Sequence, residues 1–373
     1  MSPVVTGVAA VSAFGRGADA LLAGALAGTP AFRPVERFDV TGRRVGVAAT
    51  MAGSPDLGTE LAGAVDDACA DAELTGPARA GSALLLAVHG DPALARAAEA
   101  DRPRHSADAL AHRIADACGL SGPVRAYTSA CVAASTAVAD AAATIALGRA
   151  ERIVVAAGYL VEPDQFALFD AGRALATDGR VRPFSDGRTG LLLGDGIAAI
   201  VVESADAARG RGAPVLARIP GWGRAGDAYH VVQPRPDGAG LSAAIRGALD
   251  RAGVAAGDVG YVNAHGSGTP QSDAAETAGL YAGLGDAAAG VPVSSTKSTH
   301  GQALEASGLL ELVITILALR AGRLPVNAGF LGRDAQCPLD VISDGPRAAS
   351  PAYALSVNSA FGGAHTALLV GAA

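Results

Sequence analysis

The amino-acid sequence predicts a layered α/β fold. Short apolar segments that suit strands alternate along the chain with longer Ala-rich segments that suit helices, which is the pattern of sheets covered by helices. Of the 373 residues, 50% are hydrophobic but only 4% are aromatic, so we expect small side chains to pack helices and strands closely. This composition excludes a disordered chain. The length indicates one large domain or two fused halves.

The first half of the chain has the pattern of four strands and three helices. Its apolar runs begin with Val4-Val5-Thr6-Gly7-Val8, and they are short enough for buried strands. Ala-rich runs long enough for helices separate them. We expect strands over 4–8, 83–88, 153–157 and 197–203, and helices over 18–27, 60–72 and 132–147.

The second half repeats this rhythm. We expect strands over 215–222, 259–264, 354–358 and 367–370, and helices over 241–252, 272–280 and 303–321. Between the halves, the segment 204–213 contains Gly210 and Gly212 and is followed by Pro214, a composition typical of a joint. We therefore divide the chain into two similar α/β halves, residues 1–205 and 206–373, although no repeated motif connects them.

The charges and cysteines exclude several classes of protein. The net charge is −7 and no basic stripe is present, so we expect no nucleic-acid binding. The longest apolar runs, such as 312–319, fall short of the roughly 18 residues that span a bilayer, and the N-terminus lacks the basic segment of a signal peptide. The four cysteines form no C-x-x-C pair, so neither disulfides nor a zinc site is expected, and a reducing cytoplasm fits best.

The basic residues are strongly biased. Of the 29 Lys and Arg residues, 28 are arginines and one is a lysine, Lys297. An ammonium is a compact, rotatable donor of three protons, whereas a guanidinium is a planar fork. The single lysine therefore indicates chemistry that arginine cannot perform, unless it was retained by chance.

Cys131 is the candidate nucleophile. It lies in the segment Tyr127 to Ser135, YTSACVAAS, immediately before the helix expected to run to about residue 147. The N-terminus of a helix stabilises a thiolate through its dipole and its free N–H groups. The alternative is a buried cysteine that only fills the core. Packing is the preferred interpretation of the other three cysteines, Cys69, Cys118 and Cys337.

Three further polar segments follow expected strands or glycine-rich turns. His265 lies in VNAHGSGTP, just past a strand, where α/β sheets display ligand-binding groups. Taken alone, it is a catalytic residue or a hydrogen-bonded turn residue. Lys297 lies in SSTKSTHGQ, and Phe361 lies in the last such segment, NSAFGG.

Motifs of other enzyme classes are absent from the sequence. It contains no G-x-x-x-x-G-K-[ST] loop and no G-x-G-x-x-G between a strand and a helix, so phosphate binding by such a loop is excluded. It also contains no G-x-S-x-G motif, which argues against a serine hydrolase.

The four segments around Cys131, His265, Lys297 and Phe361 resemble, in this order, those of the β-ketoacyl synthases, condensing enzymes of the thiolase fold. The strand 4–8, the triplet RFD at 37–39, RPFSDGR at 182–188 and GDG at 194–196 are also similar to that family. The resemblance covers essentially the whole chain, and several collinear motifs are far more specific than one. It implies an αβαβα layered fold with two similar halves.

The resemblance also implies roles for the reacting groups. Cys131 would take the acyl group as a thioester, and the backbone N–H groups of Cys131 and Phe361 would bind the oxyanion. The Phe361 side chain would gate the pocket. His265 would donate to the thioester oxygen of a malonyl group as the enolate forms.

Supporting roles follow from the same resemblance. Lys297 would supply a fixed positive charge, with Glu311 as its partner fourteen residues later; the alternative for Glu311 is a solvated helix residue. Ser267 and Thr269 would donate hydroxyls to a phosphopantetheine arm. The Gly362-Gly363 turn would line the substrate site.

The main departure from the family pattern is Gln302. The family usually has a histidine five residues after the lysine, and here His300 stands two places earlier. Three interpretations remain open. Gln302 replaces the imidazole as a neutral donor, which we favour; His300 reaches the site by another backbone path; or decarboxylation is impaired and the protein only transfers acyl groups or works beside a partner.

Glu305 is a second departure, because the family usually has a small residue at its position. The sequence leaves two interpretations open, an exposed side chain or a substitution that narrows the substrate pocket. Packing across the expected dimer interface also determines the length of that pocket, so the identity of the substrate stays open.

The implied activity is decarboxylative condensation of the acyl group on Cys131 with a malonyl-type thioester, in fatty-acid or polyketide biosynthesis. The alternatives are acyl transfer without decarboxylation and a ketosynthase-like partner subunit of a heterodimer. Such a subunit generally lacks the nucleophile, so Cys131 argues against it. An acyl carrier protein is the expected partner, together with a second copy or a ketosynthase-like subunit. We expect no cofactor and no metal site.

Overall fold

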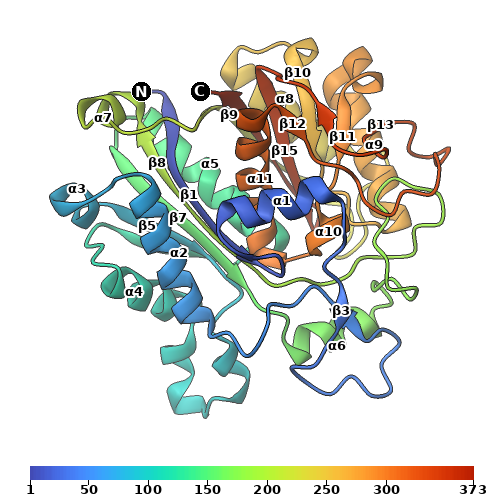
Figure 1. Cartoon of the computed structure of the whole chain (residues 1–373), viewed down its shortest axis with the longest axis horizontal. Coiled ribbons are helices and arrows are strands. Elements are labelled where there is room, and N and C mark those ends of the chain that lie inside the picture. The colour runs from blue at the N-terminus through green and yellow to red at the C-terminus, as the bar shows by residue number, and fades with distance from the viewer.

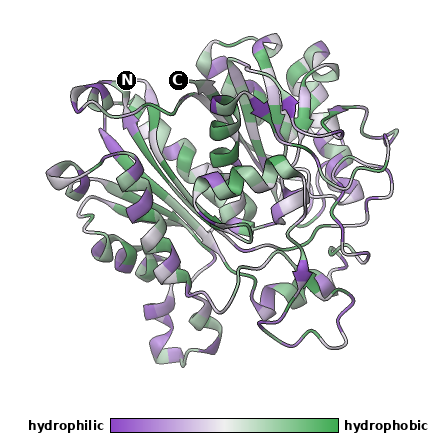
Figure 2. Ribbon diagram, viewed as in Figure 1, coloured by the Kyte–Doolittle hydropathy of each residue, from purple (hydrophilic) through white to green (hydrophobic).

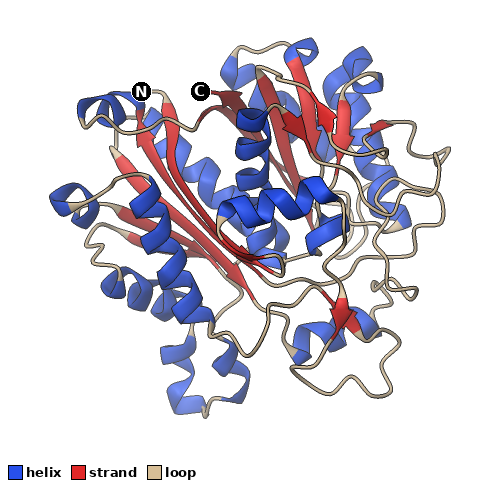
Figure 3. Ribbon diagram, in the orientation of Figure 1, coloured by secondary structure: helices blue, strands red, loops and turns tan.

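The computed structural model describes all 373 residues. A twelve-stranded mixed sheet runs through the molecule in the order β13-β11-β10-β15-β16-β9-β1-β8-β7-β5-β6, with β2 paired to β1 at one end. Two further two-stranded sheets pair β12 with β14 and β3 with β4. Figure 3 shows the two groups of strands with helices between and around them. The expected layered α/β fold is confirmed.

Eight of the sixteen strands are those expected from the apolar runs: β5 and β10 end one residue early, β9 is displaced toward the C-terminus, and the other five are longer than expected. The sixteen strands are β1 (Pro3–Ser12), β2 (Gly15–Arg16), β3 (Arg33–Pro34), β4 (Val47–Ala48), β5 (Ala83–Ala87), β6 (Val124–Tyr127), β7 (Arg152–Tyr159), β8 (Gly196–Ser204), β9 (Ala217–Gly226), β10 (Val259–Asn263), β11 (Pro292–Ser294), β12 (Arg323–Leu324), β13 (Asp340–Val341), β14 (Arg347–Ala348), β15 (Tyr353–Ala360) and β16 (Ala364–Ala372).

The helices likewise follow the Ala-rich segments. The α-helices are α1 (Ala18–Ala27), α2 (Leu57–Asp71), α3 (Gly76–Ala80), α4 (Ala107–Ala117), α5 (Ala133–Ala146), α6 (Pro163–Ala171), α7 (Ala205–Gly210), α8 (Ala239–Ala252), α9 (Pro270–Leu284), α10 (Lys297–His300) and α11 (Ser307–Ala321). Six short 3₁₀ helices complete the chain: η1 (Pro92–Arg96), η2 (Glu99–His105), η3 (Ala130–Val132), η4 (Ala256–Asp258), η5 (Gly285–Ala289) and η6 (Leu304–Ala306).

The two halves of the large sheet have the same strand pattern. In the first, β8 lies antiparallel between β1 and β7, and β7, β5 and β6 are parallel. In the second, β16 lies antiparallel between β9 and β15, and β15, β10 and β11 are parallel. The halves join where β1 pairs with β9 at Val4 and Val5. The division at residues 205/206 stays a prediction; the chain leaves β8 at Ser204 and enters α7.

Helices form three layers around these strands. The central helices α5 and α11 pack against each other, and both contact strands of the two halves. On the outer faces, α2 and α4 cover the first group of strands, and α8 covers β9 and β16 with α9 beside it (Figure 1). This is an αβαβα arrangement. The buried positions of α5 are mostly alanines, which lets the strands of both halves approach it closely.

The hydrophobic core follows the same layers. Its largest cluster surrounds α5 and α11, and two smaller clusters lie under the outer helices. Figure 2 shows hydrophobic residues gathered in the central strands and α11, with hydrophilic residues on the outer helices. No helix is both long enough and apolar enough to cross a membrane.

Candidate active site

Cys131 lies on a sharp turn between β6 and α5. The chain leaves the strand at Tyr127, passes through η3 and begins the helix at Ala133. Ala130, just before the cysteine, has a φ of 51°, a left-handed conformation that costs energy for a residue with a Cβ. The turn places Cys131 one step before the helix, as the sequence predicts, with 8% of its surface exposed.

Burial keeps the Cys131 sulfur as a thiol. Burial raises the pKa of Cys131 to about 12, and the carboxylate of Glu305 adds to this effect, while a hydrogen bond from Gln302 and the charge of Lys297 act against it. This direction is opposite to the expectation that the start of a helix would favour the thiolate, because loss of water around the sulfur disfavours its charged form. A proton acceptor is needed when the thiol reacts.

Gln302 presents its amide to this thiol. Its side-chain oxygen accepts a hydrogen bond from Ser307 Oγ at 3.1 Å, which leaves the NH₂ group to face Cys131. The backbone of Gln302 is held by Leu192 and Gly194, at 2.7 and 3.0 Å. The residue is 2% exposed, so its position is fixed by packing on every side.

His300 does not take the place of Gln302. Its ring is fully buried and its Nε2 lies 3.0 Å from Thr296 Oγ1, one turn earlier in the chain. Burial lowers the pKa of His300 to about 3, and Lys297 lowers it further, so the imidazole is neutral. Of the two candidates, only Gln302 is among the groups that shift the pKa of the Cys131 thiol, which it lowers.

His265 lies just past the end of β10, where Glu276 anchors the backbone. The two oxygens of Glu276 accept from the N–H groups of His265 and Gly266, both at 2.7 Å. Burial lowers the pKa of His265 well below its ordinary value, and the charges of Lys297 and His365 act in the same direction. The imidazole is therefore neutral, and its Nδ1 has no partner in the protein.

Lys297 lies behind this histidine in a buried ion pair. Its Nζ donates to the backbone oxygen of His265 at 2.8 Å and lies 2.5 Å from Glu311 Oε1. Asn358 donates to the second oxygen of Glu311 at 2.6 Å. The side chains of the pair are 1% and 0% exposed, so Glu311 is not a solvated helix residue. A compact ammonium fits such a site, whereas a planar guanidinium needs more room.

The hydroxyls of Ser267 and Thr269 lie together in the loop after His265. Their oxygens are 3.0 Å apart, and the Thr269 N–H donates to Ser267 Oγ at 3.3 Å. Ser267 is 3% exposed and Thr269 is partly exposed. The loop thus holds two hydroxyl groups close to His265.

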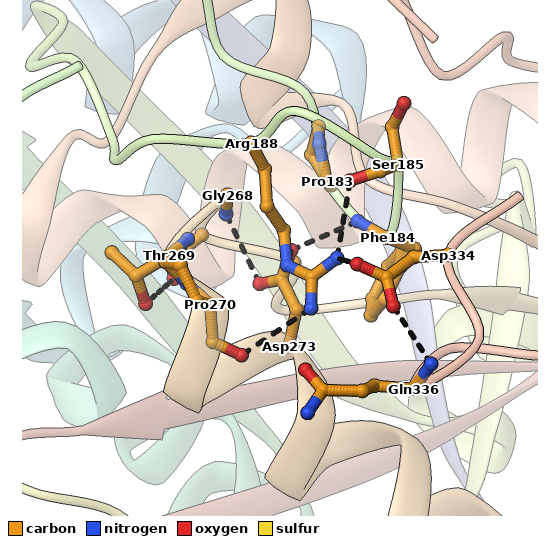
Figure 4. Close-up of polar contacts among 12 residues, drawn as sticks. Pro183, Phe184, Ser185, Arg188, Gly268, Thr269, Pro270, Asp273, Asp334 and Gln336 are labelled. Carbon is orange, nitrogen blue, oxygen red and sulfur yellow. Dashed lines mark hydrogen bonds and ion pairs between the residues drawn. The ribbon is translucent and has the colours of Figure 1, made fainter. Parts of the chain in front are cut away.

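A buried arginine holds this loop in place. Arg188 donates to the oxygens of Ser185 and Pro270 at 3.1 and 3.5 Å and pairs with Asp334 (Figure 4). Asp273 accepts from the N–H groups of Phe184 and Gly268, at 2.8 and 3.1 Å. Three distant segments are tied together around the loop, which explains how a glycine-rich stretch keeps one shape.

Phe361 lies at the tip of the hairpin between β15 and β16. It is 51% exposed and stacks on Phe169, with ring centroids 5.8 Å apart. Gly362 and Gly363, which follow it, have φ values of 84° and 73°, a conformation that side chains rarely adopt. The gating role expected of Phe361 stays a prediction.

His365 lies near the site, carries no motif and was given no role from the sequence. The Nδ1 atom of His365 shares a hydrogen bond with Ser359 Oγ at 2.8 Å, and its Nε2 atom lies 3.1 Å from Asp227 Oδ1. The Gly362-Gly363 turn beside His365 was the only sequence signal. Glu305 is 3% exposed, so its interpretation as an exposed side chain is wrong. No group of three or more His, Cys, Asp or Glu side chains is arranged to hold a metal ion.

Solved structures of ketosynthases resemble this protein over its whole length. Over the whole chain, the structure matches a β-ketoacyl synthase from Burkholderia phymatum STM815 (TM-score 0.92, 27% identity, 99% of that chain). It matches the ishigamide ketosynthase/chain length factor equally closely (TM-score 0.91, 28% identity, 99% of that chain). A third match is the ketosynthase of the AntDE:AntF complex, a type II PKS acyl-carrier protein bound to its ketosynthase (TM-score 0.92, 25% identity, 99% of that chain). The fold is that of the thiolase-type condensing enzymes.

Sequence comparison gives the family within that class. The beta-ketoacyl synthase N-terminal domain matches residues 86–208 and the C-terminal domain matches residues 216–331. Nodulation protein E of Rhizobium meliloti is 39% identical over 263 residues, and 3-oxoacyl-[acyl-carrier-protein] synthase 2 of Staphylococcus aureus is 35% identical over 257. These alignments span 70% and 68% of this chain and 64% of each relative's length. The chain belongs to the β-ketoacyl synthase family.

Proposed function

We propose that this protein is a β-ketoacyl synthase that condenses an acyl group on Cys131 with a malonyl-type thioester in fatty-acid or polyketide biosynthesis. The observation that carries the proposal is the set of groups around one thiol. Cys131 stands on a strained strand-to-helix turn, and the Gln302 amide lowers the pKa of its thiol. The neutral His265 lies on the buried Lys297–Glu311 pair, and the charge of Lys297 acts on both the thiol and the imidazole.

The first step forms the thioester. Cys131 loses its proton, which the neutral imidazole of His265 can accept, and the sulfur attacks the acyl carbonyl of the incoming thioester. The backbone N–H groups of Cys131 and Phe361 stabilise the oxyanion. The bond to the carrier sulfur breaks, and the carrier leaves as a thiol with the proton. Because burial raises the pKa of the Cys131 thiol, the thiol needs a base such as the neutral His265 to take its proton as it attacks.

The second step forms the carbon–carbon bond. The malonyl C–C bond breaks and CO₂ leaves, and the electron pair passes to the thioester as an enolate. The neutral His265 and the Gln302 amide donate to the enolate oxygen. The enolate carbon then attacks the Cys131 thioester, and the C–S bond breaks to regenerate the thiolate. Because an amide cannot ionise, decarboxylation has little dependence on the titration of the group at position 302.

Acyl transfer without decarboxylation is the second candidate. It is favoured by the same Gln302, because an amide is a weaker polariser of an enolate than an imidazole that can carry charge. In this case Cys131 accepts an acyl group and passes it to an alcohol or amine. The loading step is the same in the two candidates, and the release of CO₂ separates them.

The partners follow from the chemistry of the substrates. We propose that an acyl carrier protein delivers both thioesters and that Ser267 and Thr269 bind its phosphopantetheine arm, with the Gly362-Gly363 turn opposite. A second ketosynthase-like chain, identical or not, completes the assembly. The division into halves at residues 205/206 places Cys131 on one half and the His265 and Lys297 loops on the other. All four cysteines are buried and free, which fits a cytoplasmic location.

The test combines two measurements on the same protein. Acyl loading of Cys131 is followed by intact-protein mass spectrometry, and CO₂ release is followed from a labelled malonyl carrier. We expect both, and no loading on Cys131→Ala. Loading without CO₂ release would favour acyl transfer, and no loading would favour a non-catalytic subunit.

Two variants test which side chain, Gln302 or His300, donates a hydrogen bond to the enolate oxygen. Gln302→Ala is expected to lower condensation about 10²-fold, as removal of one oxyanion donor does, while His300→Ala keeps most of it. The opposite order would assign the role to His300. If the protein only transfers acyl groups, Gln302→His is expected to gain CO₂ release.

A further inference from the structure

Ser307 lies close to the reactive thiol, on the segment that also carries Gln302. It is the first residue of α11, and this helix packs against η3, where Cys131 stands. The short η6, between Gln302 and Ser307, packs against η3 as well. Ser307 is fully buried. Its hydroxyl must therefore find its hydrogen-bond partners within the protein.

The Ser307 hydroxyl has one donor and one acceptor beside it. The backbone N–H of Ala303 donates to Ser307 Oγ at 2.9 Å, and Ser307 Oγ donates to Gln302 Oε1 at 3.1 Å. A backbone N–H can only donate, so the serine oxygen accepts at Ala303 and its single proton goes to the amide. These two bonds determine which end of the Gln302 amide faces the serine.

This arrangement disfavours the reversed amide. If the NH₂ group of Gln302 faced Ser307, the buried hydroxyl would meet two donors and its own proton would have no acceptor. A buried donor without a partner makes that orientation about tenfold rarer or more. The serine therefore keeps the amide oxygen on its own side and the NH₂ group on the opposite side.

The NH₂ group of Gln302 is left free to donate. No oxygen of the protein accepts from this nitrogen, yet it is not among the buried unpaired atoms, so a ligand can reach it. Gln302 also lowers the pKa of the Cys131 thiol, as a donor to the sulfur does. The neutral thiol alone would favour the reversed amide, because its S–H is a weak donor and would bond to the amide oxygen. Ser307 opposes that reversal.

We propose that Ser307 is a positioning residue for the condensation: its hydroxyl holds the oxygen of Gln302 and thereby turns the amide NH₂ group toward Cys131, where it donates to the enolate oxygen. This inference rests on the proposed function, because it explains how an amide acts as a donor in that same reaction. A glutamine carries a donor and an acceptor at one end, so without such a partner it would present either of them. Ser307 acts only through Gln302.

The first measurement follows CO₂ release from a labelled malonyl carrier. Ser307→Ala is expected to lower its rate about tenfold, the factor by which the serine favours the productive orientation, and Ser307→Thr to keep most of it, because the hydroxyl remains. The matched control is Ser242→Ala, which removes a buried hydroxyl near the start of α8, where it donates to the oxygen of Ala239 at 3.1 Å. This control is expected to keep the wild-type rate. An unchanged rate in Ser307→Ala overturns the proposal.

A double-mutant cycle separates positioning from a structural defect. Gln302→Ala has no amide to orient, so adding Ser307→Ala to it is expected to lower CO₂ release no further, within about twofold. A serine that only supported the fold would act in both backgrounds. Two losses that multiply in the double variant therefore overturn the proposal.

Alkylation of Cys131 by iodoacetamide tests the orientation of the amide without any acyl transfer. The rate is measured at about pH 8 by peptide mass spectrometry. Loss of one hydrogen bond to the charged sulfur lowers the thiolate fraction about tenfold, and the greater nucleophilicity of the more basic thiolate recovers part of this loss. Ser307→Ala is therefore expected to react about threefold more slowly than the wild-type protein, and Ser307→Thr and Ser242→Ala at the wild-type rate.

This second measurement keeps the inference separate from the proposed function. An equal alkylation rate in Ser307→Ala and the wild-type protein would refute the orienting role of Ser307, even in a protein that condenses normally. Slower alkylation of Ser307→Ala in a protein that releases no CO₂ would refute condensation and leave the orienting role standing.

Discussion

Removing the charge of Lys297 is expected to destabilise the whole fold. In Lys297→Met the side chain keeps about its length but loses two interactions, the 2.8 Å bond to the oxygen of His265 and the 2.5 Å contact with Glu311. Bonds to charged groups are each worth about 1.5–3 kcal/mol, so two bring the loss to about 3–6 kcal/mol. Breaking buried ion pairs elsewhere costs about 3–5 kcal/mol. Folded proteins are stable by only about 5–15 kcal/mol.

Urea unfolding followed by the fluorescence of the single tryptophan, Trp222, measures this change. We expect a lower midpoint at an unchanged slope. The double variant Lys297→Met/Glu311→Leu removes both charges and is expected to recover at least half of the loss, because no buried charge is left unpaired.

Arg209→Met is the control, since it breaks the pair with Asp206 in which the side chains are 77% and 69% exposed, and is expected to cost less than about 1 kcal/mol. If Lys297→Met costs no more than Arg209→Met, or if the double variant is no more stable than the single one, the argument from an uncompensated buried charge fails.

Two other variants test the segment between Lys297 and Gln302. Gly301 has a φ of 78°, and a Cβ there would lie 2.8 Å from the oxygen of Leu193. Gly301→Ala is therefore expected to lower the free energy of unfolding in urea by about 1–3 kcal/mol and to lower the condensation rate, because it displaces Gln302. Full condensation activity in this variant would contradict the prediction. The pKa of His300 falls to about 3 on folding, so the unfolded chain binds more protons between pH 6.5 and 3 and the free energy of unfolding falls as the pH is lowered through that range. His300→Asn is expected to flatten that slope in urea unfolding from pH 7 to 4, and an unchanged slope would show that His300 does not titrate in this way.

Much of the fold and part of the site could be predicted from the sequence. The apolar run 197–203 became β8 (Gly196–Ser204), with one residue added at each end. The helix expected over 303–321 begins later, at Ser307, after η6, because Leu304 has a φ of 41°, a left-handed conformation that a right-handed α-helix cannot contain. The strand β6 was missed because Val-Arg-Ala-Tyr is short and half exposed at the edge of the sheet.

Electrostatic effects could not be predicted in the same way. The position of Cys131 before α5 followed from composition, but its raised pKa depends on burial by residues far away in the sequence, among them Glu305. The pairing of His365 with Asp227 at 3.1 Å joins residues 138 positions apart that share no motif. Burial and side-chain hydrogen bonds are properties of the packed chain, so the contact between Ser307 and Gln302 carries no signal in the sequence.

The burial of Lys297 also makes the chain unusual as a chemical target. The side chain of Lys297 carries the only lysine amine of the sequence and is 1% exposed. Acylating labels directed at lysine will therefore find no accessible side chain in the folded protein. A tag on Lys297 appears only when its ion pair with Glu311 has opened, so tagging of this one residue counts local unfolding events without any engineered reporter.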